Sequence, residues 1–221
     1  MPQDILAPAR RYWRALRRRP LAEMIERIHG EKFEPVEILD IGGSPDFWLS
    51  IPEKTRAKAS IGFVDRPGAY PSELTGDELK IAGAVRRLPG DARDLSGFDA
   101  GAFDLVVCNA VVSLVGGWAE MKKAAAQARR VGRRGWIEFP AYEFPVALFG
   151  VPFAHWLSYP AQIGLLNLFG GEVFKTLSVD EQYDRLEHMR PLTRAHVQRL
   201  FPKVEISTER LILPRRHIAI W

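Results

Sequence analysis

The sequence predicts an α/β fold: a Rossmann-like, doubly wound sheet of seven strands, mostly parallel, with an antiparallel last strand. Three observations carry this prediction. Short apolar runs alternate with helical segments between residues 35 and 140, which is typical of a parallel sheet covered by helices on both faces. The first apolar run stops at the glycine turn "LDIGGSP". The C-terminal stretch "KVEISTERLILPRRHIAIW" alternates as two strands around Pro214, which predicts a final antiparallel pair.

The N-terminal region, residues 1–34, is predicted as an extension of two short helices that Pro20 separates. The first helix is strongly basic, because six arginines lie between Arg10 and Arg19. The simpler interpretation is a solvated helix face that covers one edge of the core. The alternative is a peripheral contact with an anionic membrane or with RNA, although nucleic acid is not the partner that we expect.

Residues 35–221 form the second predicted unit. Its parallel strands are expected at residues 36–41, 60–65, 84–88, 104–108 and 135–139, and a helix is expected at residues 118–131. In sheets of this kind, ligands bind beyond the carboxyl ends of the strands. The residues that follow each strand are therefore the first candidates for a functional site.

The composition sets limits on the function. The chain has 221 residues, of which 47% are hydrophobic and 26% charged, as in a soluble globular domain. The net charge of +4 does not by itself imply a nucleic acid partner. The lone Cys108 forms no internal disulfide, and no cluster of cysteine and histidine has metal-ligand spacing, so no metal is expected. No apolar signal or run of about 18 apolar residues occurs, and we expect a cytoplasmic protein.

The turn after the first strand has the features of a ligand-binding loop. Asp40 lies near the strand end, and Gly42 and Gly43 permit backbone angles and close approaches that a side chain blocks. Ser44 is a good N-cap and Pro45 suits the first helical position. Such a turn presents backbone N–H groups beside a helix N-terminus and can hold a nucleotide-like ligand, or it can be a tight turn without one.

Polar residues follow the next strands as well. Asp65 ends the second strand 25 residues after Asp40, and an acid at such a spacing can accept hydrogen bonds from ribose hydroxyls. Asp91 and Ala92 follow the third strand, where a carboxylate can meet an adenine amino group. Asn109 ends the fourth strand. Their succession after a glycine turn favours a nucleotide-like ligand over three unrelated loop residues.

The chain resembles the class I S-adenosylmethionine-dependent methyltransferases over roughly residues 36–140. "LDIGG" resembles the first motif, "GDARDL" the adenine-side motif and "FDLVVCNAVVSLV" the fourth-strand motif, and the small bacterial type 11 group is most similar. The resemblance implies S-adenosylmethionine as the cofactor. Asp40 and Gly42 would line its methionine and ribose side, Asp65 would hold the ribose, and Asn109 would flank the transferred methyl. The implied cofactor-binding set is Asp40, Gly42, Gly43, Asp65, Asp91, Ala92 and Asn109.

Three positions depart from the family pattern. Ser44 replaces a usual glycine of the first motif, and Ser113 and Leu114 stand where many relatives carry Glu-His. These departures motivate an alternative, a methyltransferase-fold protein without catalysis that binds a ligand or serves as a scaffold.

Residues 141–200 are predicted as a helical cap or insertion after the fifth strand. The stretch from Tyr142 to Tyr159 is rich in aromatic residues and could line a pocket for a small apolar or aromatic acceptor, or could simply pack on the core. His155 is the candidate catalytic base, because its ordinary pKa lies near neutrality. Tyr142 and Glu138 are weaker candidates.

Overall fold

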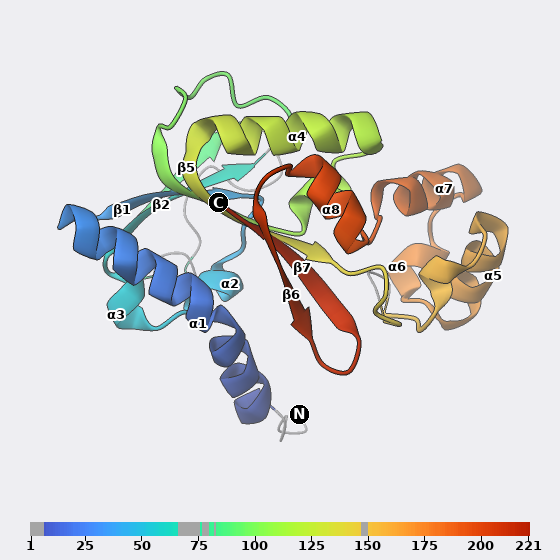
Figure 1. Ribbon diagram of the computed structural model, residues 1–221. Coiled ribbons are helices and arrows are strands. Elements are labelled where there is room, and N and C mark those ends of the chain that lie inside the picture. Colours follow the sequence, from blue (N-terminus) through green and yellow to red (C-terminus); the bar gives the residue numbers. More distant parts are fainter. Residues whose placement is uncertain (1–6, 66–75, 77–79, 82, 147–149) are drawn as a thin grey trace.

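The chain forms a seven-stranded sheet flanked by helices on both faces (Figure 1). The computed structural model describes residues 7–65, 76, 80–81, 83–146 and 150–221, and residues 7–16 by their backbone alone. The sheet order is β3-β2-β1-β4-β5-β7-β6. The strands are β1 (Val36–Ile41), β2 (Ala59–Asp65), β3 (Ala84–Pro89), β4 (Phe103–Asn109), β5 (Gly132–Pro140), β6 (Glu205–Arg210) and β7 (Pro214–Ile220).

The pairing confirms the predicted fold class. Strands β1 to β5 pair in parallel, while β7 runs antiparallel to both β5 and β6. The predicted bounds of the parallel strands agree with the structure to within three residues at either end. For β1, β2 and β4 this accuracy has a simple origin, since buried parallel strands are mostly apolar runs in the sequence. Strand β3 is not buried in this way and contains two arginines.

Two helical layers enclose the sheet, and a third group of helices lies beyond the end of β5 (Figure 1). One face carries α4 (Trp118–Val131) and α8 (Arg194–Leu200), and the other carries α1 (Ala7–Lys32), α2 (Pro45–Leu49) and α3 (Glu53–Arg56). The remaining helical elements are η1 (Val111–Leu114), η2 (Ala154–Trp156), α5 (Tyr159–Phe169), α6 (Glu172–Lys175) and α7 (Val179–His188).

The N-terminal helix differs from the prediction. Two helices divided at Pro20 were expected, but α1 is one helix that contains Pro20, so that prediction is wrong. Leu21, Ile25 and Ile28 are fully buried against β1 and its neighbours. Their packing holds the second half of the helix in place, which offsets the hydrogen bond that proline cannot donate. The bend of α1 in Figure 1 is the usual response to a proline within a helix.

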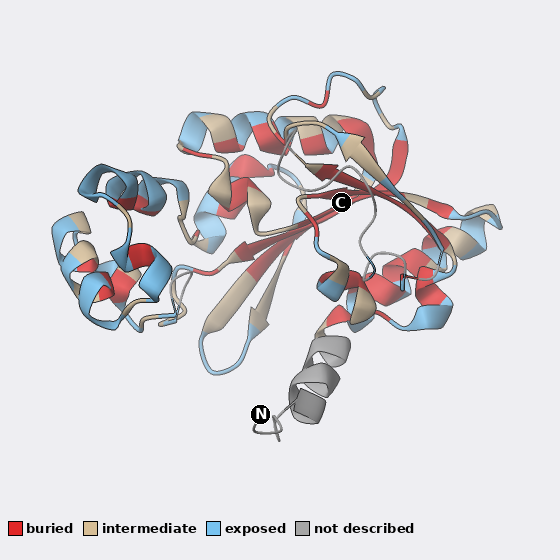
Figure 2. Cartoon of the chain, turned by 180° about the vertical axis from the view of Figure 1, so that it is seen from behind, coloured by how far each residue is buried: buried red, intermediate tan, exposed pale blue. Residues whose placement is uncertain are grey.

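The helical region after β5 divides between two cores. Helices α5, α6 and α7 share a small core of their own around Leu166, Phe174 and Leu186. Figure 2 shows that most of their outer surface is exposed. Helix α8 belongs instead to the main core, because Val197 and Leu200 pack with residues of α4 on the sheet. The predicted cap therefore contains one compact unit, α5 to α7, and one helix of the sheet layer.

Candidate functional site

The loops after the parallel strands meet at one edge of the sheet. The Gly42 amide donates to the Val64 carbonyl at 2.9 Å, and the Gly90 amide donates to the Asp65 carbonyl at 3.1 Å. These bonds join the loops that follow β1 and β3 to the end of β2. The residues predicted from the ends of β1, β2, β3 and β4 are thus brought to the same edge.

Asp40 is buried beneath the glycine turn. Its side chain is 1% exposed, and the indole nitrogen of Trp48 donates to Oδ2 at 2.6 Å. Within the described part of the chain, Oδ1 is buried without a hydrogen-bond partner. Burial is the main reason that the pKa of Asp40 rises to about 7. The site therefore contains a carboxyl group with an unsatisfied oxygen.

Both turn positions require glycine, because neighbouring atoms of the protein itself leave no room for a Cβ. Gly42 has a positive φ of +65°, and a Cβ there would lie 2.5 Å from Cγ2 of Val111. A Cβ at Gly43 would overlap the carboxylate of Asp40. We expected a side chain at Gly42 to occupy space that a cofactor needs, but the structure places Val111 beside this position. Ser44 does occupy the N-cap position of α2, and its side chain makes no capping hydrogen bond.

The predicted ribose-binding acid has a partner within the protein. Nη1 of Arg87 lies 3.8 Å from Oδ2 of Asp65, whose side chain is 16% exposed. Arg87 and Asp65 lie on neighbouring strands of the sheet. Sequence reasoning missed this pair, since a cross-strand neighbour can be found only once the register of β2 and β3 is known.

The predicted adenine-side acid is also paired. Oδ1 of Asp91 accepts hydrogen bonds from the backbone and Nε of Arg93, at 2.8 and 2.9 Å, and Oδ2 accepts one from Nη2 at 2.6 Å. Asp91 and Arg93 are two positions apart, and this spacing was a visible signal in the sequence. Ala92, between them, is buried. An adenine contact to Asp91 would compete with Arg93.

Asn109 opens onto two cavities of about 290 Å³ each, which share Asn109, Arg215 and Arg216. We call these two adjacent cavities together the arginine hollow. One part reaches toward the turn at Ser44, and the other part is lined by apolar residues that include Phe144. None of the arginines that line this hollow was predicted as a site residue.

Glu138, on β5 beside Asn109, is engaged by two arginines. It is 2% exposed and forms ion pairs with Arg18 and, at 2.7 Å, with Arg216. Trp136 also donates to it at 2.9 Å. These three donors occupy both carboxylate oxygens, which leaves Glu138 poorly placed to accept a proton from an acceptor. Arg18 lies 120 residues away in the sequence, so no local signal could reveal the pair.

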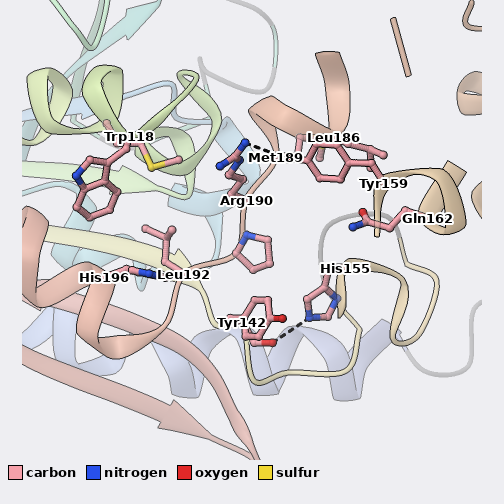
Figure 3. A pocket seen from close by; sticks show the side chains of 12 residues that line it. Trp118, Tyr142, His155, Tyr159, Gln162, Leu186, Met189, Arg190, Leu192 and His196 are labelled. Carbon is pink, nitrogen blue, oxygen red and sulfur yellow. Dashed lines mark hydrogen bonds between the residues drawn. The ribbon is translucent and has the colours of Figure 1, made fainter. Parts of the chain in front are cut away.

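His155 lies in a separate cavity of about 290 Å³ (Figure 3). Its Nε2 lies 2.9 Å from the carbonyl oxygen of Tyr142, and its ring packs edge-on against the Tyr142 ring. Trp118, Tyr159 and His196 are among the other lining residues. The residues that line this cavity include none of the predicted cofactor-binding set, and the structure does not bring His155 together with that set.

Among the described arginines of the basic helix, Arg17 and Arg18 point inward, whereas Arg19 is exposed and pairs with Glu23. Nε of Arg17 lies 3.1 Å from Oε1 of Glu209, and the guanidinium of Arg18 lies 4.0 Å from the centre of the Phe47 ring. The side chains of Arg10, Arg11 and Arg14 lie outside the described residues. No helix within the described ranges is long and apolar enough to cross a membrane. The same ranges hold no cluster of ligands for a metal ion.

The comparisons with known proteins agree with this geometry. Residues 69–137 match the family model of a methyltransferase domain. The chain has the class I methyltransferase fold. The match and the strand order together confirm the resemblance to the class I S-adenosylmethionine-dependent methyltransferases. No curated protein sequence matches the chain significantly.

Solved structures are similar in fold to most of this chain, and not only to residues 69–137, which the family model matches. An O-methyltransferase family protein from Burkholderia thailandensis is 12% identical, with a TM-score of 0.53 over 99% of this chain and 60% of that one. A 1,6-didemethyltoxoflavin-N1-methyltransferase from the same organism is 13% identical, with a TM-score of 0.50 over 91% of this chain and 75% of that one. A Rhodobacter sphaeroides protein described as a Zn-dependent alcohol dehydrogenase is 12% identical, with a TM-score of 0.53 over 89% of this chain and 87% of that one. Identities this low establish the fold alone.

Proposed function

We propose that the protein is an S-adenosylmethionine-dependent methyltransferase that acts on a small molecule. The observation that carries the proposal is the gathering of the glycine turn, Asp65, Asp91 and Asn109 at one carboxyl edge of a class I methyltransferase sheet. The structure of the 1,6-didemethyltoxoflavin-N1-methyltransferase, which holds its small-molecule ligand and S-adenosylhomocysteine, is consistent with this class of substrate.

The residues at this edge fit the cofactor. The buried Oδ1 of Asp40 lacks a partner within the described residues, as expected of a group that a ligand completes. Asp40 and the turn at Gly42 and Gly43 would hold the methionine and ribose side. Asp65 would hold the ribose, and the loop at Asp91 and Ala92 would hold the adenine. The cofactor supplies an activated methyl group, so the protein has to bind, orient and exclude water.

The acceptor is proposed to be apolar or aromatic. Asn109 would flank the transferred methyl, and the arginine hollow that opens beside it is walled by Phe139, Phe144 and Val146. His155 stays the predicted general base for an acceptor that extends from Asn109 into the separate cavity that His155 lines. Acceptors that lose no proton on methylation would not need it.

A methyltransferase-fold protein without catalysis is the second candidate. The observation in its favour is that Asp65 and Asp91 already have arginine partners, Arg87 and Arg93. A cofactor that uses these carboxylates must compete with charges in the protein itself.

Calorimetric titration separates the two candidates. We expect S-adenosylmethionine and S-adenosylhomocysteine to bind with micromolar dissociation constants, equivalent to about −8 kcal/mol. The absence of heat and of any thermal stabilisation at millimolar concentrations of both ligands would overturn the proposal and leave the non-catalytic alternative.

A further inference from the structure

Four arginines from the two ends of the chain converge on the arginine hollow. Arg17 and Arg18 come from α1, and Arg215 and Arg216 come from β7. All four line the part of the hollow that reaches toward Ser44. Convergence of guanidinium groups from distant segments is costly, because their charges repel one another unless anions intervene.

Fewer carboxylates than arginines lie among these residues. Glu138 pairs with Arg18 and Arg216. Glu209 lies 3.1 Å from Arg17 and 3.8 Å from Arg215. The four arginines thus share two glutamates as ion-pair partners. Asp46 also lines the hollow, but it is exposed to solvent, where its charge is screened.

Arg215 is the least satisfied of the four arginines. Its Nη1 atom is buried and makes no hydrogen bond within the described part of the chain, and its contact with Glu209 at 3.8 Å is long for an ion pair. Burial, followed by the charges of Arg17 and Arg216, lowers the pKa of Arg215. A partly buried guanidinium with an unpartnered buried nitrogen gains from an added anion.

The arginine hollow has an apolar side next to these charges. Phe144 and Val146 line the part that Arg215 shares with Asn109, and the Arg215 guanidinium lies 5.8 Å from the centre of the Phe144 ring. A guanidinium beside an aromatic wall suits a ligand that is apolar at one end and anionic at the other.

We propose that the acceptor carries a carboxylate or phosphate group that Arg215 and Arg216 bind, while its apolar body lies against Phe144 and Val146 beside Asn109. This inference rests on the proposed function and names the substrate class of the same site. Guanidinium groups bind both oxyanions through paired hydrogen bonds, which gives orientation as well as affinity. The methyl-accepting atom of such a ligand would be held at a fixed distance from the anion.

Three small probes test the anion site. Benzoate, phenyl phosphate and neutral benzamide are titrated into the protein, with and without saturating S-adenosylhomocysteine, and binding is followed by ligand-observed NMR. We expect at least one anion to bind about 10-fold or more tightly than benzamide, the range for hydrogen bonds to a charged group. Equal binding of all three probes, or binding of none at about 20 mM, would overturn the inference.

Variants test whether Arg215 causes the preference for anionic probes over benzamide. Arg215→Gln should reduce the anion preference to about 3-fold or less, and Arg215→Lys should retain part of it because the charge remains. Arg133→Gln, an equal charge change on the exposed start of β5, should leave it unchanged. A full preference in folded Arg215→Gln would contradict the assignment. If that variant does not fold, the comparison of benzoate and phenyl phosphate with benzamide in the wild-type protein decides alone.

Binding of S-adenosylhomocysteine distinguishes the acceptor from the cofactor, whose methionine carboxylate is the other source of an oxyanion. We expect Arg215→Gln to bind S-adenosylhomocysteine within about 2-fold of the wild type, about 0.4 kcal/mol. Loss of this binding in the variant alone would assign the arginines to the cofactor and overturn the inference. If the wild-type protein does not bind S-adenosylhomocysteine either, the proposed function is overturned. The probe titrations without S-adenosylhomocysteine then still decide whether the anion site exists.

Discussion

The indole nitrogen of Trp48 donates a hydrogen bond to the carboxyl group of Asp40, at 2.6 Å, beneath the glycine turn. The two residues are 1% exposed or less, and they connect the end of β1 to helix α2. This contact fixes one oxygen of Asp40 and leaves the other without a partner among the described residues. Its position makes the turn sensitive both to pH and to small changes in volume.

Asp40 should make the stability of the protein depend on pH. Burial raises its pKa in the folded protein from 3.8 to about 7. Between these values the folded state holds a proton that the unfolded state has released, so stability falls as pH rises, by at most about 1.4 kcal/mol per unit. We expect denaturation between pH 4.5 and 8 to show this loss in the wild type relative to Asp40→Asn. A constant difference between the two proteins across that range would contradict the prediction.

Gly43→Ala should destabilise the protein by roughly 1–3 kcal/mol, the cost of overpacking a filled site. The added Cβ would overlap the Asp40 carboxylate. Asp40→Ala in the same chain removes the obstacle, so the double variant should lose less stability than the two single variants do together. Gly97→Ala is the matched control, because a Cβ there has no neighbour within 4 Å. Strictly additive effects in urea denaturation would refute the steric explanation.

Asp65→Ala should weaken binding of S-adenosylhomocysteine by about 10–100-fold, which is roughly 1.5–3 kcal/mol for hydrogen bonds to a charged group. Asp65 ends β2 at the edge where the predicted cofactor residues meet. Calorimetric titration measures the change, and Asp99→Ala, an exposed position before β4, serves as the control. Unchanged affinity in Asp65→Ala would remove this residue from the proposed cofactor site.

Glu138→Gln should reduce stability by about 3–5 kcal/mol, because it leaves buried guanidinium charge without its anion. Glu138 is the shared partner of Arg18 and Arg216. The exposed pair of Arg19 and Glu23 provides the contrast, and Glu23→Gln should cost less than about 1 kcal/mol. Equal losses in chemical denaturation would show that burial of the first pair has no energetic consequence.

His155→Gln should slow methyl transfer without changing the affinity for S-adenosylhomocysteine, if His155 removes a proton from the acceptor. The variant keeps a side chain that can hydrogen bond to the Tyr142 carbonyl, although it loses the ring contact with Tyr142. Transfer rates and calorimetry together give the result. Identical rates in the variant and the wild type would restrict His155 to packing against Tyr142.

The sequence by itself determined the main framework of the fold. Strand β1 was predicted with the bounds Val36–Ile41 that the structure shows, and α4 with the bounds Trp118–Val131. The glycine turn and the polar residues at the strand ends were also visible in the sequence. These features depend on neighbours along the chain, such as apolar runs, turn residues and helix caps, which the sequence states directly.

Only the tertiary structure decided which charges meet and where the cavities lie. Arg18 pairs with Glu138, 120 residues away, and His155 lies in a different cavity from Asn109. Helix α1 passes through Pro20 because its buried face is held by the sheet. Each of these outcomes depends on contacts between segments that are remote in sequence. Their energies come from burial and charge pairing, which exist only after the chain has folded.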